Sequence, residues 1–230
     1  MLFIVSIICS CGNNASKKAE EEGHADDAVS NYRKPRTIEE ACSVSDYATA
    51  HEILERLRYA VLTTSWAQQR ENRAVYLSAL ETVYTSELTY IALNYPQDMD
   101  LRIMVRMNEM VPLGEKPDEG LIGYYETEDD GVLEQKGQEY NTYALWVKTY
   151  NSICNKLFDV AVITKNQHLA QSATSFAKEN VKFTKGSDER VVKINGVKVD
   201  RAHGYVQLVK TDINALKGRY NDAVKSGLFK

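Results

Sequence analysis

The residues best placed for metal chemistry are His51 and Glu52, which lie in a stretch with the periodicity of a helix. A zinc-protease helix has the pattern His-Glu-x-x-His, because two histidines one turn apart bind the metal and the glutamate acts as general base. Here Glu55 stands at the position of the second histidine, and the other histidines are scattered along the chain. We therefore interpret His51 and Glu52 as an exposed pair on an amphipathic helix, and we predict no metal site and no cofactor.

A second acidic run, from Glu126 to Gly131, has the oxygen-rich character of a calcium-binding loop. Such a loop needs a bidentate glutamate at its twelfth position, which is Gly137 here, so we do not expect calcium binding. The sequence also has no glycine-rich phosphate-binding loop and no Gly-x-Ser-x-Gly nucleophile motif. These patterns identify no catalytic residue and favour a protein that is not an enzyme.

Cys11 has more specific surroundings than any other reactive residue. It follows an apolar stretch that begins at Met1 and ends with Ile8, Cys9 and Ser10. This arrangement resembles the signal of bacterial lipoproteins, in which an aliphatic residue and then a small residue precede the cysteine that carries the lipid. Cys9 fits this pattern less well, because Ile8 would then have to take the place of the small residue.

The resemblance implies cleavage before Cys11 and acylation of this cysteine with chains such as palmitate. The apolar stretch is shorter than the ~20 residues that a membrane-spanning helix needs, so the acyl chains themselves would hold the protein at the membrane. The implied location is the bacterial cell envelope, with the protein anchored to a membrane such as the outer membrane and facing the periplasm or the surface.

The next part of the chain, residues 12–36, has almost no large apolar side chain. Such a segment cannot bury enough surface to offset the entropy of ordering it, so we predict a flexible tether. The organisation expected from the sequence is a signal at residues 1–11, a tether at residues 12–36 and a single all-helical domain at residues 37–230.

The composition is that of an ordinary globular chain, with 43% hydrophobic and 26% charged residues. A net charge of −4 gives no general attraction to nucleic acid, which we exclude as a partner. Cys42 and Cys154 both lie in stretches with helical periodicity, on the apolar face. A disulfide between them in an oxidising compartment and two free buried thiols both remain open.

Apolar residues recur every three to four positions over most of the chain and predict a mainly α fold. We expect helices at about 46–61, 70–93, 98–112, 138–164, 167–181 and 200–226. Asp46 is the expected N-cap of the first, and Pro96 sets the end of the second. The helix at 138–164 has apolar residues on more than one face, which indicates that it is central.

The exception is the segment at about 190–199, where Asn195 and Gly196 separate two short β-branched runs. This residue pair tolerates the positive φ angles of a type I′ turn, so we predict a small β-hairpin. We favour a hairpin that is simply part of the loop between two helices over a protruding edge strand that pairs with a partner.

Residues 38–57 resemble the junction between two helices of a tetratricopeptide-type repeat, in which an aromatic residue such as Tyr47 and a small one such as Ala50 let the helices approach closely. We find no sustained repeat at the usual period of ~34 residues. The architecture that we expect is therefore an irregular stack or bundle of helical hairpins.

Tyr124 and Tyr125 lie beside the acidic run, where no helical periodicity requires an aromatic residue. A tyrosine ring with a polar tip suits contact with a ligand or a partner, and this is our hypothesis for both residues. The function that we expect is an envelope-anchored, non-catalytic helical module that binds an unknown protein. Surface capture of a glycan or another nutrient, and an enzyme with dispersed catalytic residues, are the alternatives.

Overall fold

The computed structural model describes residues 34–118, 120–124, 130–186, 190–194, 196–201 and 203–229. Residues 34–230 form one compact unit. The expected signal at residues 1–11, with Cys11, and nearly all of the expected tether lie outside the described residues.

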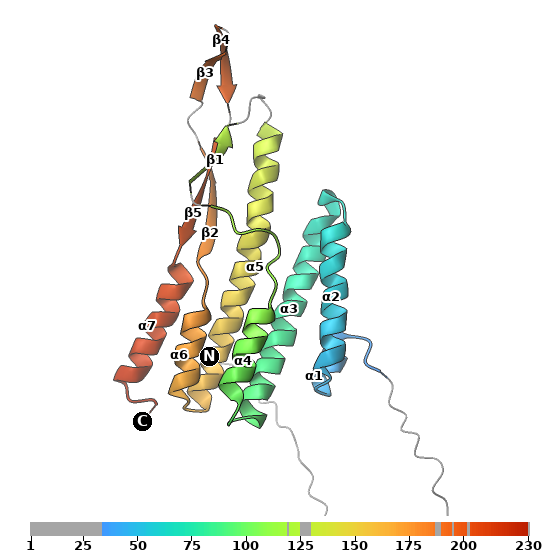
Figure 1. The fold of residues 1–230 in the computed structure, drawn as a ribbon, viewed down its shortest axis with the longest axis vertical. Coiled ribbons are helices and arrows are strands. Elements are labelled where there is room, and N and C mark those ends of the chain that lie inside the picture. The colour runs from blue at the N-terminus through green and yellow to red at the C-terminus, as the bar shows by residue number, and fades with distance from the viewer. Residues whose placement is uncertain are drawn as a thin grey trace, which may run out of the picture. The chain divides into compact units, whose positions relative to one another are not determined.

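Helices make up most of the described part of the chain, and the expected mainly α class is confirmed (Figure 1). The elements in order are α1 (Ile38–Ser43), α2 (Tyr47–Thr63), α3 (Trp66–Asn94), α4 (Met99–Glu109), β1 (Gly120–Tyr124), α5 (Asp130–Ile163), α6 (Gln167–Phe176), β2 (Asn180–Lys185), β3 (Arg190–Ile194), β4 (Val197–Arg201), β5 (His203–Val209) and α7 (Thr211–Lys225).

The long helix α5 is the centre of the bundle. Figure 1 shows α3 and α2 on one side of it and α6 and α7 on the other. The largest fully buried side chains include Trp146, Tyr150 and Phe158 of this helix, and α5 packs against α3 on one side and α6 on the other. Burial of such large apolar groups is the main favourable term in folding. The prediction of a central helix is confirmed, because other helices cover α5 on both sides.

Local signals in the sequence set several helix ends. The side chain of Asp46 accepts a hydrogen bond from the backbone N–H of Thr49 and caps α2 as predicted. Helix α3 ends at Asn94, because the residue before Pro96 is biased away from helical backbone angles. Ala41 and Ala50 are fully buried where α1 and α2 meet α3, so small residues do allow close packing there.

The predicted β-hairpin is confirmed. Strands β3 and β4 pair in antiparallel register with Ile194 opposite Val197, which leaves a two-residue connection. Gly196 in this connection has a φ of 84°, a backbone conformation that strongly favours glycine.

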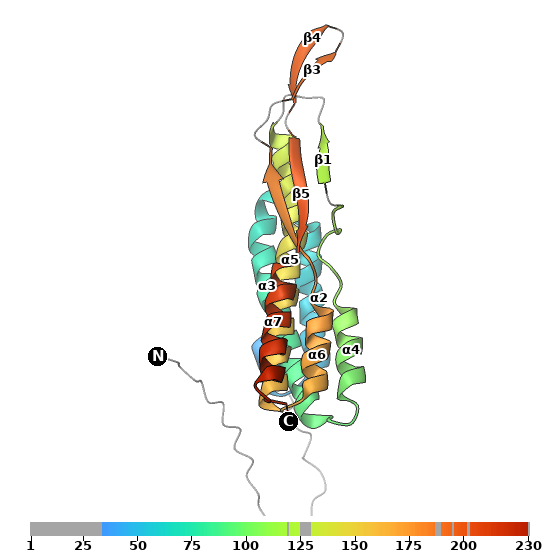
Figure 2. The ribbon, with the colours of Figure 1, turned by 90° about the vertical axis from the view of Figure 1, so that its left-hand side faces the viewer.

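A three-stranded antiparallel sheet, in the order β1-β5-β2, was not expected. It replaces parts of two predicted helices: α6 ends at Phe176 rather than near residue 181, and residues 203–209 form β5 instead of the first half of a helix. Figure 2 shows β5 and β2 alongside α5. The unit is therefore not all-helical, although helices dominate it.

Asn151 of α5 explains why the chain leaves the helical state after α6. Its side-chain amide donates to the carbonyl oxygen of Lys178 at 2.9 Å, and its amide oxygen accepts from the N–H of Lys178 at 2.8 Å. The connection to β2 therefore finds its backbone partners on α5 rather than within a longer helix. Helix α5 and strand β2 also approach each other closely at Gly137. A Cβ atom on this glycine would lie 2.5 Å from the ring of Phe183 in β2.

Candidate functional site

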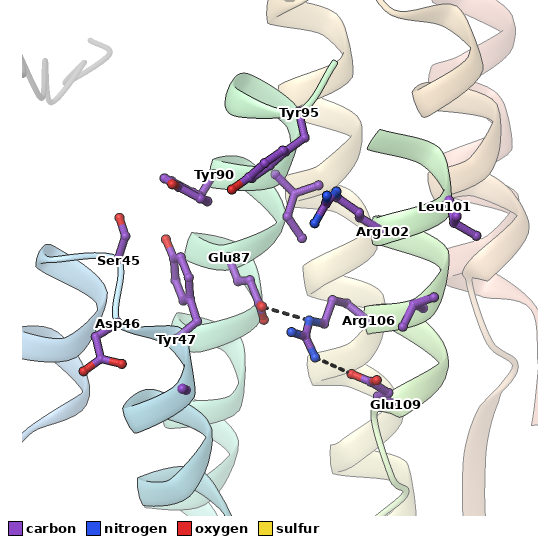
Figure 3. Close-up of a pocket in the computed structure, with 13 residues that line it drawn as sticks. Ser45, Asp46, Tyr47, Glu87, Tyr90, Tyr95, Leu101, Arg102, Arg106 and Glu109 are labelled. Atoms are coloured by element: carbon purple, nitrogen blue, oxygen red, sulfur yellow. Dashed lines mark hydrogen bonds and ion pairs between the residues drawn. The ribbon is translucent and has the colours of Figure 1, made fainter. Parts of the chain in front are cut away.

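An open pocket of about 650 Å³ lies between the start of α2, the second half of α3 and the length of α4 (Figure 3). Its volume falls within the range of small-molecule sites, roughly 300–1,000 Å³. The residues that line it are Ser45, Asp46, Tyr47, Ala48, Glu87, Tyr90, Ile91, Tyr95, Leu101, Arg102, Val105, Arg106 and Glu109.

Helical periodicity explains what α4 presents to this pocket. Ile103 and Met107, one turn apart, are buried in the core, and Arg102 and Arg106 form a parallel row that faces the pocket. Leu101 lies beside this row and is 61% exposed, although the pocket touches it. Helix α4 therefore supplies both guanidinium groups and an aliphatic edge.

Glu87 of α3 is the charged centre of the pocket wall, and only 5% of its side chain is exposed. One carboxylate oxygen accepts from Nε of Arg106 on α4 at 2.8 Å, and the other lies 2.7 Å from Nε2 of His51 on α2. An ionised carboxylate can only accept, so the proton of the second bond resides on Nε2 of His51. Glu87 thus joins three helices through two charge-assisted contacts.

Arg106 also binds Glu109 on its own helix, with Nη1 2.6 Å from Oε2. Burial opposes the charge of Arg106, but the hydrogen bond with Glu109 and the charge of Glu87 outweigh it and raise the pKa of the guanidinium. Arg106 therefore stays charged and holds both carboxylates in place.

Three tyrosines form a continuous aromatic strip along the α2 and α3 sides of the pocket (Figure 3). The rings of Tyr47 and Tyr90 lie 5.5 Å apart, and those of Tyr90 and Tyr95 lie 6.0 Å apart in an edge-on arrangement. A hydrogen bond with the Tyr95 side chain is the main cause that raises the pKa of Tyr90 above its ordinary value. The contacts between neighbouring rings thus hold the strip together.

Arg102 completes the pocket from α4. Its guanidinium carbon lies over the Tyr95 ring, 4.2 Å from the ring centre, in a cation–π contact. Its ion pair with Asp98 is 3.8 Å long and exposed, and such pairs contribute little. Arg102 therefore remains available to hydrogen-bond a ligand.

A second groove of about 520 Å³ lies between α1, α2 and α3. Aliphatic residues such as Ile53, Leu57 and Val75 line most of it. The described structure shows no group that would cover this groove.

The residues singled out from the sequence lie apart from one another. His51 is half-buried and contacts Glu87. The interpretation of His51 and Glu52 as an exposed pair is therefore wrong. Glu52 instead forms an ion pair with Lys34. Tyr124 is the last residue of β1, and Tyr125 lies outside the described residues, so their role in ligand contact stays a prediction.

Cys42 and Cys154 are both free thiols. Burial raises the pKa of both, and that of Cys154 to about 12. Cys154 is therefore a packed, unreactive core residue.

Sequence reasoning missed the pocket itself, although a signal for it existed. Glu87 falls on the apolar face of α3, three residues after Tyr84 and four before Ile91. A charge at such a position must find partners on other elements, because burial of an unpaired carboxylate is costly. The partner residues could not be identified, since α2 and α4 come together only in the folded chain.

Within the described ranges, no three histidine, cysteine or acidic side chains are grouped so that they would hold a metal ion. None of the described helices combines the length and the apolar character needed to span a bilayer. Comparison with protein families, curated proteins and solved structures found no match to this chain.

Proposed function

We propose that this protein is a lipid-anchored, non-catalytic binding module of the bacterial cell envelope, and that it captures its ligand in the pocket between α2, α3 and α4. The anchor is Cys11, and residues 12–36 tether the folded unit to the membrane. The observation that carries the binding role is the combination of an aromatic strip with charged groups that are already paired.

The pairing of Glu87 favours binding over catalysis. A general base needs a lone pair directed at its substrate and a pKa matched to proton transfer. The carboxylate of Glu87 instead directs its two oxygens at His51 and Arg106, and it is almost fully buried. Groups held in this way form a rigid wall, which lowers the entropy cost of binding a ligand.

The pocket also favours a small ligand over a protein partner. The volume of about 650 Å³ is that of a small-molecule site, and tyrosines and charged side chains make up much of its lining. The alternative, a protein partner, finds its best support in the aliphatic groove between α1, α2 and α3.

The anchor makes a direct prediction. Cys11→Ser should move the protein from the membrane fraction to the soluble fraction and abolish incorporation of labelled palmitate, because no other acylation site fits the pattern. Cys9→Ser is the matched control and should leave both properties unchanged. Fractionation of the Cys11→Ser variant with the membrane, or release of the Cys9→Ser variant, would contradict the assignment of Cys11.

The pocket makes a second prediction. Wild-type protein incubated with envelope extract, washed and denatured should release a small molecule that mass spectrometry detects. The double variant Tyr90→Ala, Arg102→Ala should not release it, because both the ring and the guanidinium in the pocket are missing. Tyr59→Ala removes a tyrosine that is 69% exposed on α2 outside the pocket and should behave as wild type. If wild type and both variants release the same small molecule in equal amounts, the pocket is ruled out as the ligand site.

A further inference from the structure

We infer that the ligand of this pocket is a neutral saccharide; the inference rests on the proposed function and specifies its ligand class. It depends on three properties of the lining: the balance of charge, the balance of polar and apolar surface, and the shape of the polar groups.

The charge balance argues against an anionic ligand. The pocket is lined by the guanidinium groups of Arg102 and Arg106 and by the carboxylates of Asp46, Glu87 and Glu109. Acids therefore exceed bases by one, and Arg106 is engaged with two of them. A phosphate or a carboxylate would meet no net positive potential, so electrostatic attraction does not favour it.

The balance of polar and apolar groups argues against a lipid. The larger aliphatic side chains are the buried Ile91 and the exposed Leu101 and Val105. The remaining large surfaces belong to Tyr47, Tyr90 and Tyr95, whose rings are flat and apolar and whose hydroxyls are polar. A matching ligand has a flat face of C–H groups and a polar perimeter, as a pyranose ring does.

The shapes of the polar groups fit vicinal hydroxyls. A guanidinium presents paired N–H donors in one plane, and a carboxylate presents two oxygens with room for several donors. The guanidinium of Arg102 lies over the Tyr95 ring, and Glu109 uses one oxygen on Arg106. Adjacent hydroxyl groups, which both donate and accept, can bond with groups of either kind at once.

The test uses the full-length protein and defined oligosaccharides. The neutral probes are maltotriose, cellotriose and triacetylchitotriose, and the anionic probes are trigalacturonate and inorganic phosphate. Saturation-transfer NMR and calorimetry should detect at least one neutral probe at millimolar concentration or below. Thermal unfolding of each variant confirms that it is folded.

Three variants separate the contributions. Tyr90→Ala should weaken binding of the neutral probe about tenfold or more, equivalent to ~1.4 kcal/mol, because the stacking surface is lost. Tyr90→Phe keeps the ring and should bind within about threefold of wild type. Arg102→Lys keeps the charge but loses the planar pair of donors, so a neutral saccharide should bind about tenfold more weakly and an anion should not.

Binding of the anionic probes alone, unchanged affinity in Arg102→Lys, or no signal from any neutral probe would each overturn the saccharide assignment. The same applies if the molecule captured from envelope extract in a pocket-dependent manner is not a saccharide. The proposed function survives all of these results as long as that capture depends on Tyr90 and Arg102. The proposed binding role fails when the double variant captures the same molecules as wild type, or when wild type captures none.

Discussion

Glu87→Ala is expected to lower the free energy of unfolding by about 3 kcal/mol. The change removes a side chain that is only 5% exposed. Its carboxylate accepts hydrogen bonds from His51 on α2 and Arg106 on α4. A hydrogen bond to a charged group contributes roughly 1.5–3 kcal/mol, and the loss leaves Arg106 and His51 without their buried partner. Urea unfolding measured by circular dichroism gives the free energy directly.

Glu109→Ala is the matched control, because Glu109 also binds Arg106 but its side chain is 49% exposed. This variant should lose no more than about 1 kcal/mol, as exposed ion pairs do. Glu87→Gln should fall between the two, because its amide oxygen can satisfy one donor while its NH2 group opposes the other. Equal losses for Glu87→Ala and Glu109→Ala would show that Glu87 does not hold α2, α3 and α4 together.

Stability is expected to decrease steeply above about pH 10, with cooperative unfolding before pH 12. Burial raises the pKa of Tyr76 to about 12, and burial likewise raises the pKa values of Tyr84 and Tyr150. In the unfolded chain these hydroxyls ionise near pH 10, so above that pH the unfolded state has lost protons that the folded state still holds. Unfolding then releases protons, and a higher pH favours it.

The stabilisation from these groups is therefore complete below about pH 10. It disappears as the pH approaches the pKa values of the tyrosines in the folded protein. Each group that stays protonated in the folded state lowers the free energy of unfolding by about 1.4 kcal/mol per pH unit in this window. Tyr76→Phe keeps the buried ring but removes one titrating hydroxyl, so its stability should decline less steeply with pH. Urea unfolding at several values between pH 8 and about 11.5 measures the slopes. Parallel slopes for the variant and the wild type would show that Tyr76 is not held protonated by the fold.

Short-range patterns in the sequence predicted the elements that depend on local chemistry. Asp46 caps α2, Pro96 follows the end of α3, and Gly196 lies in the connection between β3 and β4. In each case the residue controls its own backbone conformation or that of a close neighbour. The central position of α5 was also predictable, because apolar residues on several faces require cover on more than one side.

The three-stranded sheet was not predictable in the same way. Val206, Leu208 and Val209 fit an extended strand as well as one turn of an amphipathic helix, so their spacing does not decide between the two. The choice depends on β5 pairing with both β1 and β2, and on Asn151 binding the backbone of Lys178 before β2 begins. These partners are distant in the chain, and no local pattern reveals them.

By itself, the sequence determined the mainly α class, most helix boundaries, the β3–β4 hairpin and the hypothesis of a lipid anchor at Cys11. Each of these depends on residues that are close together along the chain. The tertiary structure alone decided that His51, Glu87 and Arg106 meet, and that Tyr47, Tyr90, Tyr95 and Arg102 line one pocket. The physical reason is that side chains from α2, α3 and α4 come within contact distance only after burial of the apolar faces has packed these helices together.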